Sequence, residues 1–279
     1  MGIVLHTLAA LGYALLGLRP WRALAGHAGT LATPTEKSLL GLVLLIHGAG
    51  LYAAMVGDGE LRMGLGLALS ATLWLGILVF WLESFIIRVD GVRLVLLPLA
   101  ALAALMPVAM QHPISIPHTG TPWLAAHLTV SLAAYGIMTI AALHALLMAA
   151  ADRRLHSPQP TADSAGMSPA WGRLFDAIPP LLVLEQVLFR LIWIGFVLLT
   201  LAVLTGAAMS RALGGPLLPF DHKTVFTLLS WITFGTLLLG RCLRGWRGRV
   251  AVRYTLAGLI LLLLAYAGSR FVLELVLQR

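Results

Sequence analysis

Most of this chain consists of apolar segments of about 20 residues, and the short connections between them hold nearly all of its charges. Hydrophobic residues make up 59% of the sequence and charged residues only 11%, whereas a soluble domain is normally about 25% charged. A bilayer offers no hydrogen-bond partner to exposed backbone, so apolar runs of this length must be helical. The sequence predicts an all-α polytopic membrane protein with one integral membrane domain over residues 1–279.

Charges and Pro/Gly clusters divide the chain into about eight transmembrane helices. The predicted spans are residues 2–18, 38–56, 63–86, 92–110, 123–150, 188–210, 223–240 and 252–273. With this alternation, fourteen of the 19 lysines and arginines fall on one side of the membrane. Because cytoplasmic connections carry an excess of basic residues, we expect that side to be cytoplasmic and both termini to lie outside.

Two connections are longer than the others. Residues 152–178, between spans five and six, contain Pro, Ser and Gly and read as a flexible cytoplasmic linker. An amphipathic run at 181–187 follows and is a candidate for a helix on the membrane surface. The outer connection, residues 111–122, holds three prolines and two histidines, so we expect it to be stiff and to pack over the bundle.

The charge and the cysteine content exclude several function classes. The net charge of +8 comes from residues that flank apolar segments, where they set topology and meet anionic lipid headgroups. We therefore expect the lipid bilayer, and no nucleic acid, among the partners. The single Cys242 excludes an internal disulfide and, within one chain, a multi-cysteine metal site or an iron–sulfur cluster.

Histidines inside predicted spans are the main candidates for function. His47 lies about midway through the second span, and His127 lies just over one turn below the outer surface. An ionisable residue inside the membrane is a functional-site hypothesis by default. With about 1.5 Å of rise per residue, the two imidazoles lie at similar depths, as bis-histidine ligation of haem iron requires. Hydrogen bonding between helices and zinc binding are the open alternatives.

Two segments resemble the cytochrome c assembly family (the CcsA, ResC and CcmC proteins). WLAAHLTVSLAAYGIMTIAALHAL is similar to the family's H-V-x-x-x-x-x-x-Y helix, with Leu128 in place of Val. VLLTLAVLTGAAMSRALGGPLLPFDHKTVFTLLSW resembles its L-L-T-x-G segment, its outer loop and the W-D-P-K-E-T-W helix. The pattern DHKT…GWRGR…AYAGSRFVLE resembles the YpjD subgroup of bacterial inner-membrane proteins, over essentially the whole chain.

The resemblance implies a role for several residues. His127 occupies the position of an outer haem ligand of the family, and Asp221, Lys223 and Trp231 match residues of the W-D-P-K-E-T-W helix. The family's tryptophans before that Asp are absent, and residues 215–220 stand in their place. The family's second outer histidine and its histidine at the inner end of the seventh helix also have no counterpart.

Together these observations predict a haem-binding or haem-handling protein of the bacterial inner membrane. We expect haem b, with His127 and His47 as axial ligands, and other membrane or cytochrome assembly proteins as possible partners. His222 and Lys223 would contact the propionates, and Trp231 and Tyr135 would pack on the macrocycle. A cofactor-free transporter with histidines along a proton or cation path, and an accessory or scaffold subunit, stay open as alternatives.

Overall fold

A computed structural model of the chain describes residues 2–25, 32–57, 60–86, 92–110, 114–115, 122–156 and 180–265. Nearly all of these residues are helical. The helices are α1 (Gly2–Ala25), α2 (Pro34–Met55), α3 (Leu65–Glu83), α4 (Arg93–Ala109), α5 (Pro122–His156), α7 (Leu181–Ala212), α8 (His222–Arg244) and α9 (Arg249–Leu263). Three short strands are β1 (Val56–Gly57), β2 (Glu60–Met63) and β3 (Ile114–Ser115).

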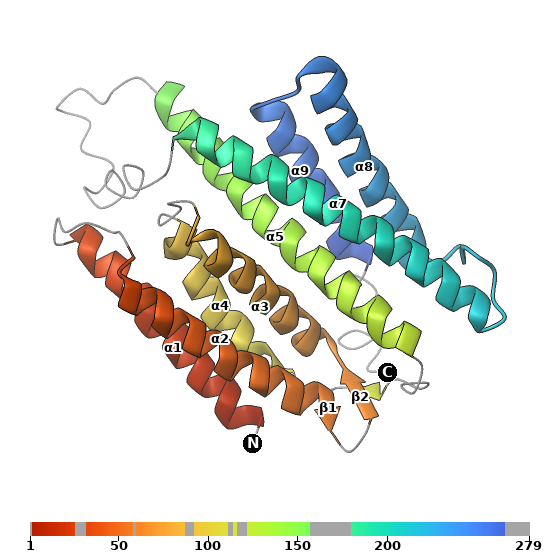
Figure 1. The fold of residues 1–279 in the computed structure, drawn as a ribbon, viewed down its shortest axis with the longest axis horizontal. Coiled ribbons are helices and arrows are strands. Elements are labelled where there is room, and N and C mark those ends of the chain that lie inside the picture. Colours follow the sequence, from red (N-terminus) through yellow and green to blue (C-terminus); the bar gives the residue numbers. More distant parts are fainter. Residues whose placement is uncertain are drawn as a thin grey trace.

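The helices form two groups that pack side by side (Figure 1). In the first group α1 packs on α2 and α4, and α3 packs on α2 and α4. In the second group α5 packs on α7 and α9, and α8 packs on α7 and α9. Contact between α3 and α5 joins the two groups. One hydrophobic core, which includes Tyr13, Phe80, Met138 and Phe234, runs through both.

Two tryptophans of α3 join it to α2 in a repeated arrangement. Trp74 and Trp81 donate indole N–H bonds to the carbonyls of Leu44 (2.8 Å) and Lys37 (2.7 Å). Each ring lies directly on a glycine of α2, because a Cβ built on Gly48 or on Gly41 would be 2.9 Å from an indole carbon. Both pairs are spaced by seven residues, two helical turns, so the same contact recurs along the interface.

The crossing of α3 and α5 depends on two glycines. A Cβ built on Gly136 would lie 2.9 Å from the Thr72 carbonyl oxygen and 2.9 Å from the Leu75 Cβ, and one built on Gly76 would lie 2.9 Å from the Ile140 side chain. Small residues at such crossings let two helix backbones approach closely in membranes. This crossing therefore sets the distance between the two groups of helices.

Most of the predicted architecture is confirmed. The eight helices follow the eight predicted spans, and six of them are long and apolar enough to cross a membrane. α4 is shorter, at 17 residues, and α9, at 15 residues, ends at Leu263. The count of eight spans and the placement of both termini outside stay predictions.

The structure differs from the sequence-based expectations in three segments. Residues 152–156 of the predicted linker continue α5, and 157–179 lie outside the described residues. Residues 181–187 are the first two turns of α7, not a separate surface helix, because no proline or glycine interrupts the helix after Pro180 until Gly195. The strands were not predicted: β2 pairs antiparallel with β1 and with β3, and this ties part of the outer connection to the end of α2.

The basic residues gather at one end of the bundle, where they pair with carboxylates. Arg93 of α4 lies 3.1 Å from Glu36 of α2, and Arg249 of α9 lies 3.0 Å from Asp152 of α5. Glu185 of α7 accepts hydrogen bonds from Arg241 and Arg247, each at 2.8 Å. We call this the arginine-rich end. The strands and the beginnings of α5 and α8, which carry His127 and Lys223, lie at the opposite end (Figure 1).

Candidate functional site

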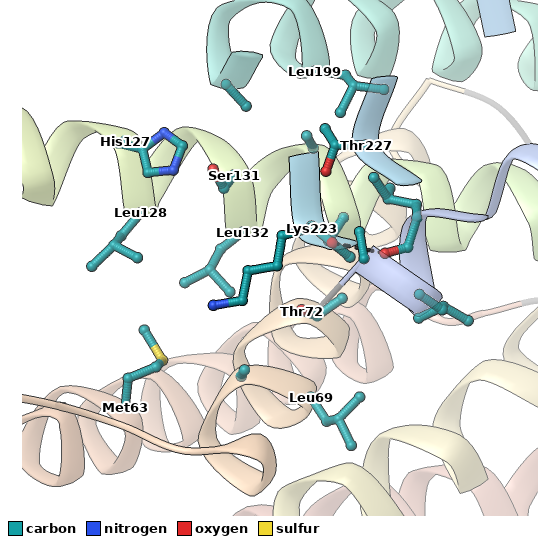
Figure 2. A pocket seen from close by; sticks show the side chains of 17 residues that line it. Met63, Leu69, Thr72, His127, Leu128, Ser131, Leu132, Leu199, Lys223 and Thr227 are labelled. Atoms are coloured by element: carbon teal, nitrogen blue, oxygen red, sulfur yellow. Dashed lines mark hydrogen bonds between the residues drawn. The ribbon is translucent and has the colours of Figure 1, made fainter. Parts of the chain in front are cut away.

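A cavity of about 290 Å³ lies at the junction of the two helix groups, toward the end that carries the strands. Most of its walls are Leu, Ala and Met side chains from β2, α3, α5, α7 and α9, and α8 contributes two polar residues (Figure 2). Its polar lining residues are Thr72, His127, Ser131, Tyr135, Lys223 and Thr227. The volume is close to the lower end of the range for small-molecule sites, about 300 Å³. The cavity thus combines apolar walls with one imidazole and one ammonium group.

The contacts of His127 fix the tautomer of its ring. The Thr205 hydroxyl donates to the Leu201 carbonyl at 2.8 Å, so its single hydrogen points to the backbone of α7. The Thr205 oxygen lies 3.0 Å from His127 Nδ1, and with its hydrogen on the backbone it is placed to accept an Nδ1–H bond. A neutral imidazole with Nδ1 protonated keeps a lone pair on Nε2, and among the described residues no hydrogen-bond donor reaches that nitrogen.

This arrangement is the usual one for a metal-binding histidine. Histidine ligands of metals almost always donate the other ring N–H to a neighbouring oxygen, which sets the ring orientation and raises the basicity of the free nitrogen. The ring also lies against the backbone of α7, since a Cβ built on Gly206 would be 3.1 Å from its Cε1 atom. Helix α7 therefore holds His127 both by a hydrogen bond and by contact at a glycine.

Lys223 enters the cavity from the first turn of α8 (Figure 2). The turn is fixed by Asp221, the N-cap residue, whose Oδ1 accepts the Thr224 N–H at 2.7 Å. Burial raises the pKa of Asp221, but the Thr224 hydrogen bonds and the nearby Lys223 and His222 outweigh it and hold this pKa below its ordinary value. An ionised Asp221 thus caps α8 and positions Lys223 at the cavity.

The two aromatic candidates occupy different places. Tyr135 lines the cavity and donates to the Leu262 carbonyl of α9 at 2.7 Å. Trp231 is not among the cavity-lining residues: its indole N–H donates to Thr200 of α7 at 2.9 Å, and its ring stacks on Phe196. Trp231 therefore joins α8 to α7 behind the site.

His47 lies in a separate, fully buried cluster of polar side chains. Its Nδ1 is 3.2 Å from the Tyr13 hydroxyl and its Nε2 is 2.9 Å from the Ser70 hydroxyl, so both ring nitrogens are hydrogen-bonded. The buried His6 ring meets it edge to face, with ring centroids 5.7 Å apart. Ser70 faces away from Thr72, which lines the cavity, so α3 stands between His47 and the cavity.

The structure thus brings His127, Tyr135 and Lys223 together and places His47 and Trp231 elsewhere. His222 is exposed as the first residue of α8, beside Lys223 but outside the cavity lining. His112 and His118 of the outer connection lie outside the described residues. The pairing of His47 with His127 stays a prediction that these contacts do not favour.

Several polar residues of the site were missed by sequence reasoning. Thr205 orients His127, and Thr72, Ser131 and Thr227 line the cavity. Ser and Thr in apolar helices commonly bond their own backbone, as Thr139, Thr200 and Thr233 do here, so single residues give no signal. Ser131 lies four residues after His127, one helical turn away, and this spacing indicates that the two side chains lie on the same face of the helix.

Comparison with known proteins tests the family resemblance directly. The profile of the family described as Cytochrome C assembly protein matches residues 36–277. The chain belongs to the cytochrome c assembly family. As the resemblance predicted, the chain is similar to the inner membrane protein YpjD of Escherichia coli strain K12, with 31% identity over 84% of this chain and 85% of that protein.

Other proteins similar to this chain match different fractions of it. An uncharacterized 28.8 kDa protein of Azospirillum brasilense is 32% identical over 85% of this chain and 84% of its own length. The cytochrome c biogenesis protein CcsA of Synechococcus sp. strain CC9311 is 25% identical over 55% of each chain. No solved structure matches the chain. His127 and Lys223 both lie within the matched family segment.

Proposed function

We propose that this protein binds haem at the cavity between the two helix groups, with His127 Nε2 as a ligand of the iron. The observation that carries the proposal is the oriented imidazole of His127, which has Nδ1–H on Thr205 and presents a free Nε2 lone pair in an apolar cavity. Neutral imidazole is a common axial ligand of haem iron. Membership of the cytochrome c assembly family supports the same ligand.

The other lining residues fit the remaining parts of haem. The leucine, alanine and methionine side chains suit an apolar macrocycle, and Tyr135 offers an aromatic ring held in place by its bond to Leu262. Lys223 provides the positive charge that a propionate requires, and His222 beside it is a second donor. Trp231 supports α8 from behind, through Thr200 and Phe196.

The haem would be held without covalent links, as a haem b. Cys242 is exposed near the C-terminal end of α8, at the arginine-rich end, whereas the cavity lies at the other end of the same helix. No thioether bond can join the two. Bound haem supplies a redox-active iron whose potential depends on its axial ligands and on burial.

Among the described residues, this proposal assigns one ligand to the iron, His127. The predicted second ligand, His47, would have to give up the Ser70 hydrogen bond and cross α3. The relatives named as cytochrome c biogenesis proteins favour haem handling in the inner membrane, with the cavity end facing outward and other cytochrome assembly proteins as recipients. A cofactor-free transporter would use His127 on a proton path and a scaffold would use its Thr205 bond to join α5 and α7, but neither requires Lys223 beside it in an apolar cavity.

The proposal is tested by titrating the detergent-purified protein with haemin and following the Soret band. We expect saturable binding that is weaker by at least about tenfold in the His127→Ala variant, because losing even the hydrogen-bond partner of a metal ligand typically costs about 10- to 100-fold in affinity. His47→Ala and His222→Ala show whether either residue supplies the second axial position.

The matched control is His144→Ala, which removes a buried histidine from the inner half of the same helix. Among the described residues His144 bonds only the Ile140 carbonyl of its own helix, and its other ring nitrogen meets no partner there, so its loss leaves no described partner group orphaned. Equal haemin affinity of wild type, His127→Ala and His144→Ala would overturn the proposal. Failure of the wild type to take up haemin would favour the cofactor-free alternatives.

A further inference from the structure

A second cavity, of about 600 Å³, lies at the arginine-rich end between α5, α7 and α9. It is separate from the His127 cavity, which shares none of its lining residues. One wall is apolar, and two of its leucines, Leu146 and Leu182, are 50% and 62% exposed on the outside of the bundle. The cavity therefore opens toward the surface that faces lipid acyl chains.

The other wall carries an excess of positive charge. Arg153, Arg249 and Arg253 line it together with Asp152 and Glu185. Both carboxylates are already occupied, since Asp152 pairs with Arg249 at 3.0 Å and Glu185 pairs with two arginines outside the cavity, each at 2.8 Å. These five arginines outnumber the two carboxylates, so the local charge is positive.

Arg253 supplies positive charge at the mouth of this cavity. It is exposed, it lies one helical turn after Arg249 on α9, and among the described residues it makes no ion pair. A guanidinium group binds the oxygens of a phosphate in a bidentate manner and is weakly hydrated, which suits a membrane interface. Its position favours an anionic group at the mouth of the cavity.

We propose that this cavity binds an anionic phospholipid, with the headgroup phosphate at Arg253 and Arg249 and the acyl chains along Leu146 and Leu182. Basic pockets between transmembrane helices on the cytoplasmic side bind anionic headgroups in this way. The apolar wall, open to the membrane, distinguishes such a ligand from a soluble phosphate compound, which would gain nothing from the leucines. This site is independent of the haem proposal.

Native mass spectrometry of the full-length protein in a neutral detergent tests the site. The probes are phosphatidylglycerol and phosphatidylcholine with identical acyl chains, and inorganic phosphate. We expect phosphatidylglycerol to be retained several-fold more strongly than phosphatidylcholine, and the preference to fall about fivefold in Arg253→Gln, the typical effect of one basic residue near an anionic lipid surface. Arg253→Lys keeps the charge and should keep most of the preference.

Arg244→Gln is the matched control, because it removes the same charge from the same end of the bundle at an exposed residue outside the cavity. Equal losses in Arg253→Gln and Arg244→Gln would show general charge attraction and overturn the site. Equal retention of the two lipids by the wild type would do the same. If the wild type retained inorganic phosphate as strongly as phosphatidylglycerol, the cavity would be assigned to a soluble phosphate, and the lipid proposal would be contradicted.

Discussion

At the scale of single residues, the behaviour of His127 depends on a threonine in another helix. Thr205 accepts the Nδ1–H bond only because its own hydrogen is committed to the Leu201 carbonyl. A hydroxyl that donates its hydrogen to its own helix backbone can thus only accept a hydrogen bond from a side chain of a neighbouring helix. The imidazole is held as one tautomer before any ligand arrives.

Replacing Thr205 with valine tests this dependence. The substitution keeps the branched shape but removes the acceptor, so the His127 ring loses its fixed tautomer and orientation. We expect haemin affinity to fall about 10- to 100-fold, as for other partners of metal-binding histidines, and the Soret titration measures it. Thr205→Ser should retain near wild-type binding. A comparable loss in Thr233→Val, whose hydroxyl bonds only its own helix, would contradict the account.

Lys223 should act through its charge. In Lys223→Met the apolar stem is kept and the ammonium group is lost, and we expect haemin to bind about two- to fivefold more weakly, the usual worth of an exposed ion pair. Lys223→Arg should preserve binding. The wild-type affinity should fall as salt rises, whereas that of Lys223→Met should depend less on salt. An unchanged salt dependence in Lys223→Met would argue against a propionate contact.

At the scale of elements, the crossing of α3 and α5 determines the shape of the cavity, because Thr72 on one helix and Ser131 to Tyr135 on the other form facing walls. At this crossing a Cβ on Gly136 would lie 2.9 Å from the Thr72 carbonyl oxygen. Separation of the two helices would therefore alter both the packing and the site.

Gly136→Ala is expected to destabilise the protein. The new Cβ would lie 2.9 Å from a backbone oxygen that cannot move without shifting α3, and overpacking of this kind costs about 1–3 kcal/mol. Thermal unfolding in detergent should show a lower midpoint. Gly235→Ala is the control, because its Cβ would meet only the Phe196 ring at 3.4 Å. An equal effect of the two substitutions would contradict the role of the crossing.

Sequence patterns predicted the positions of the helices well, but they did not predict which helices pack against each other. Long apolar runs fix where helices lie, and the orientation of His127 and Tyr135 on one helix follows from their spacing. The pairing of helices depends on surface shape, as in the glycine contacts of Trp74 and Trp81, and apolar helices differ little in hydrophobicity around their surface. The pairing of His47 with His127 rests on equal depth alone, which carries no information on the helices between two residues, and it stays a prediction.

At the scale of the whole molecule, the positive charge is concentrated at one end of the bundle. The arginine-rich end holds the ion pairs that tie helices together, and the cavity end has Lys223 and few other cations. The positive-inside rule predicts that the arginine-rich end lies in the cytoplasm and the His127 cavity at the outer face.

Cysteine labelling of intact cells tests this orientation. Cys242 is exposed at the arginine-rich end, so we expect a membrane-impermeant maleimide to label it only after the cells are permeabilised. Phe220 is 99% exposed in the connection before α8, and the double variant Phe220→Cys, Cys242→Ser should be labelled in intact cells. The reverse pattern would invert the topology.

The central claim, that His127 binds haem iron, is tested most directly by the reduced-minus-oxidised absorbance spectrum of the protein as isolated from membranes. The account predicts the visible absorption bands of a haem b in the wild type and in His144→Ala, with a pyridine haemochrome assay giving the haem content. It predicts their loss or broadening in His127→Ala with the protein still folded. An unchanged spectrum in His127→Ala would contradict the assignment of the ligand.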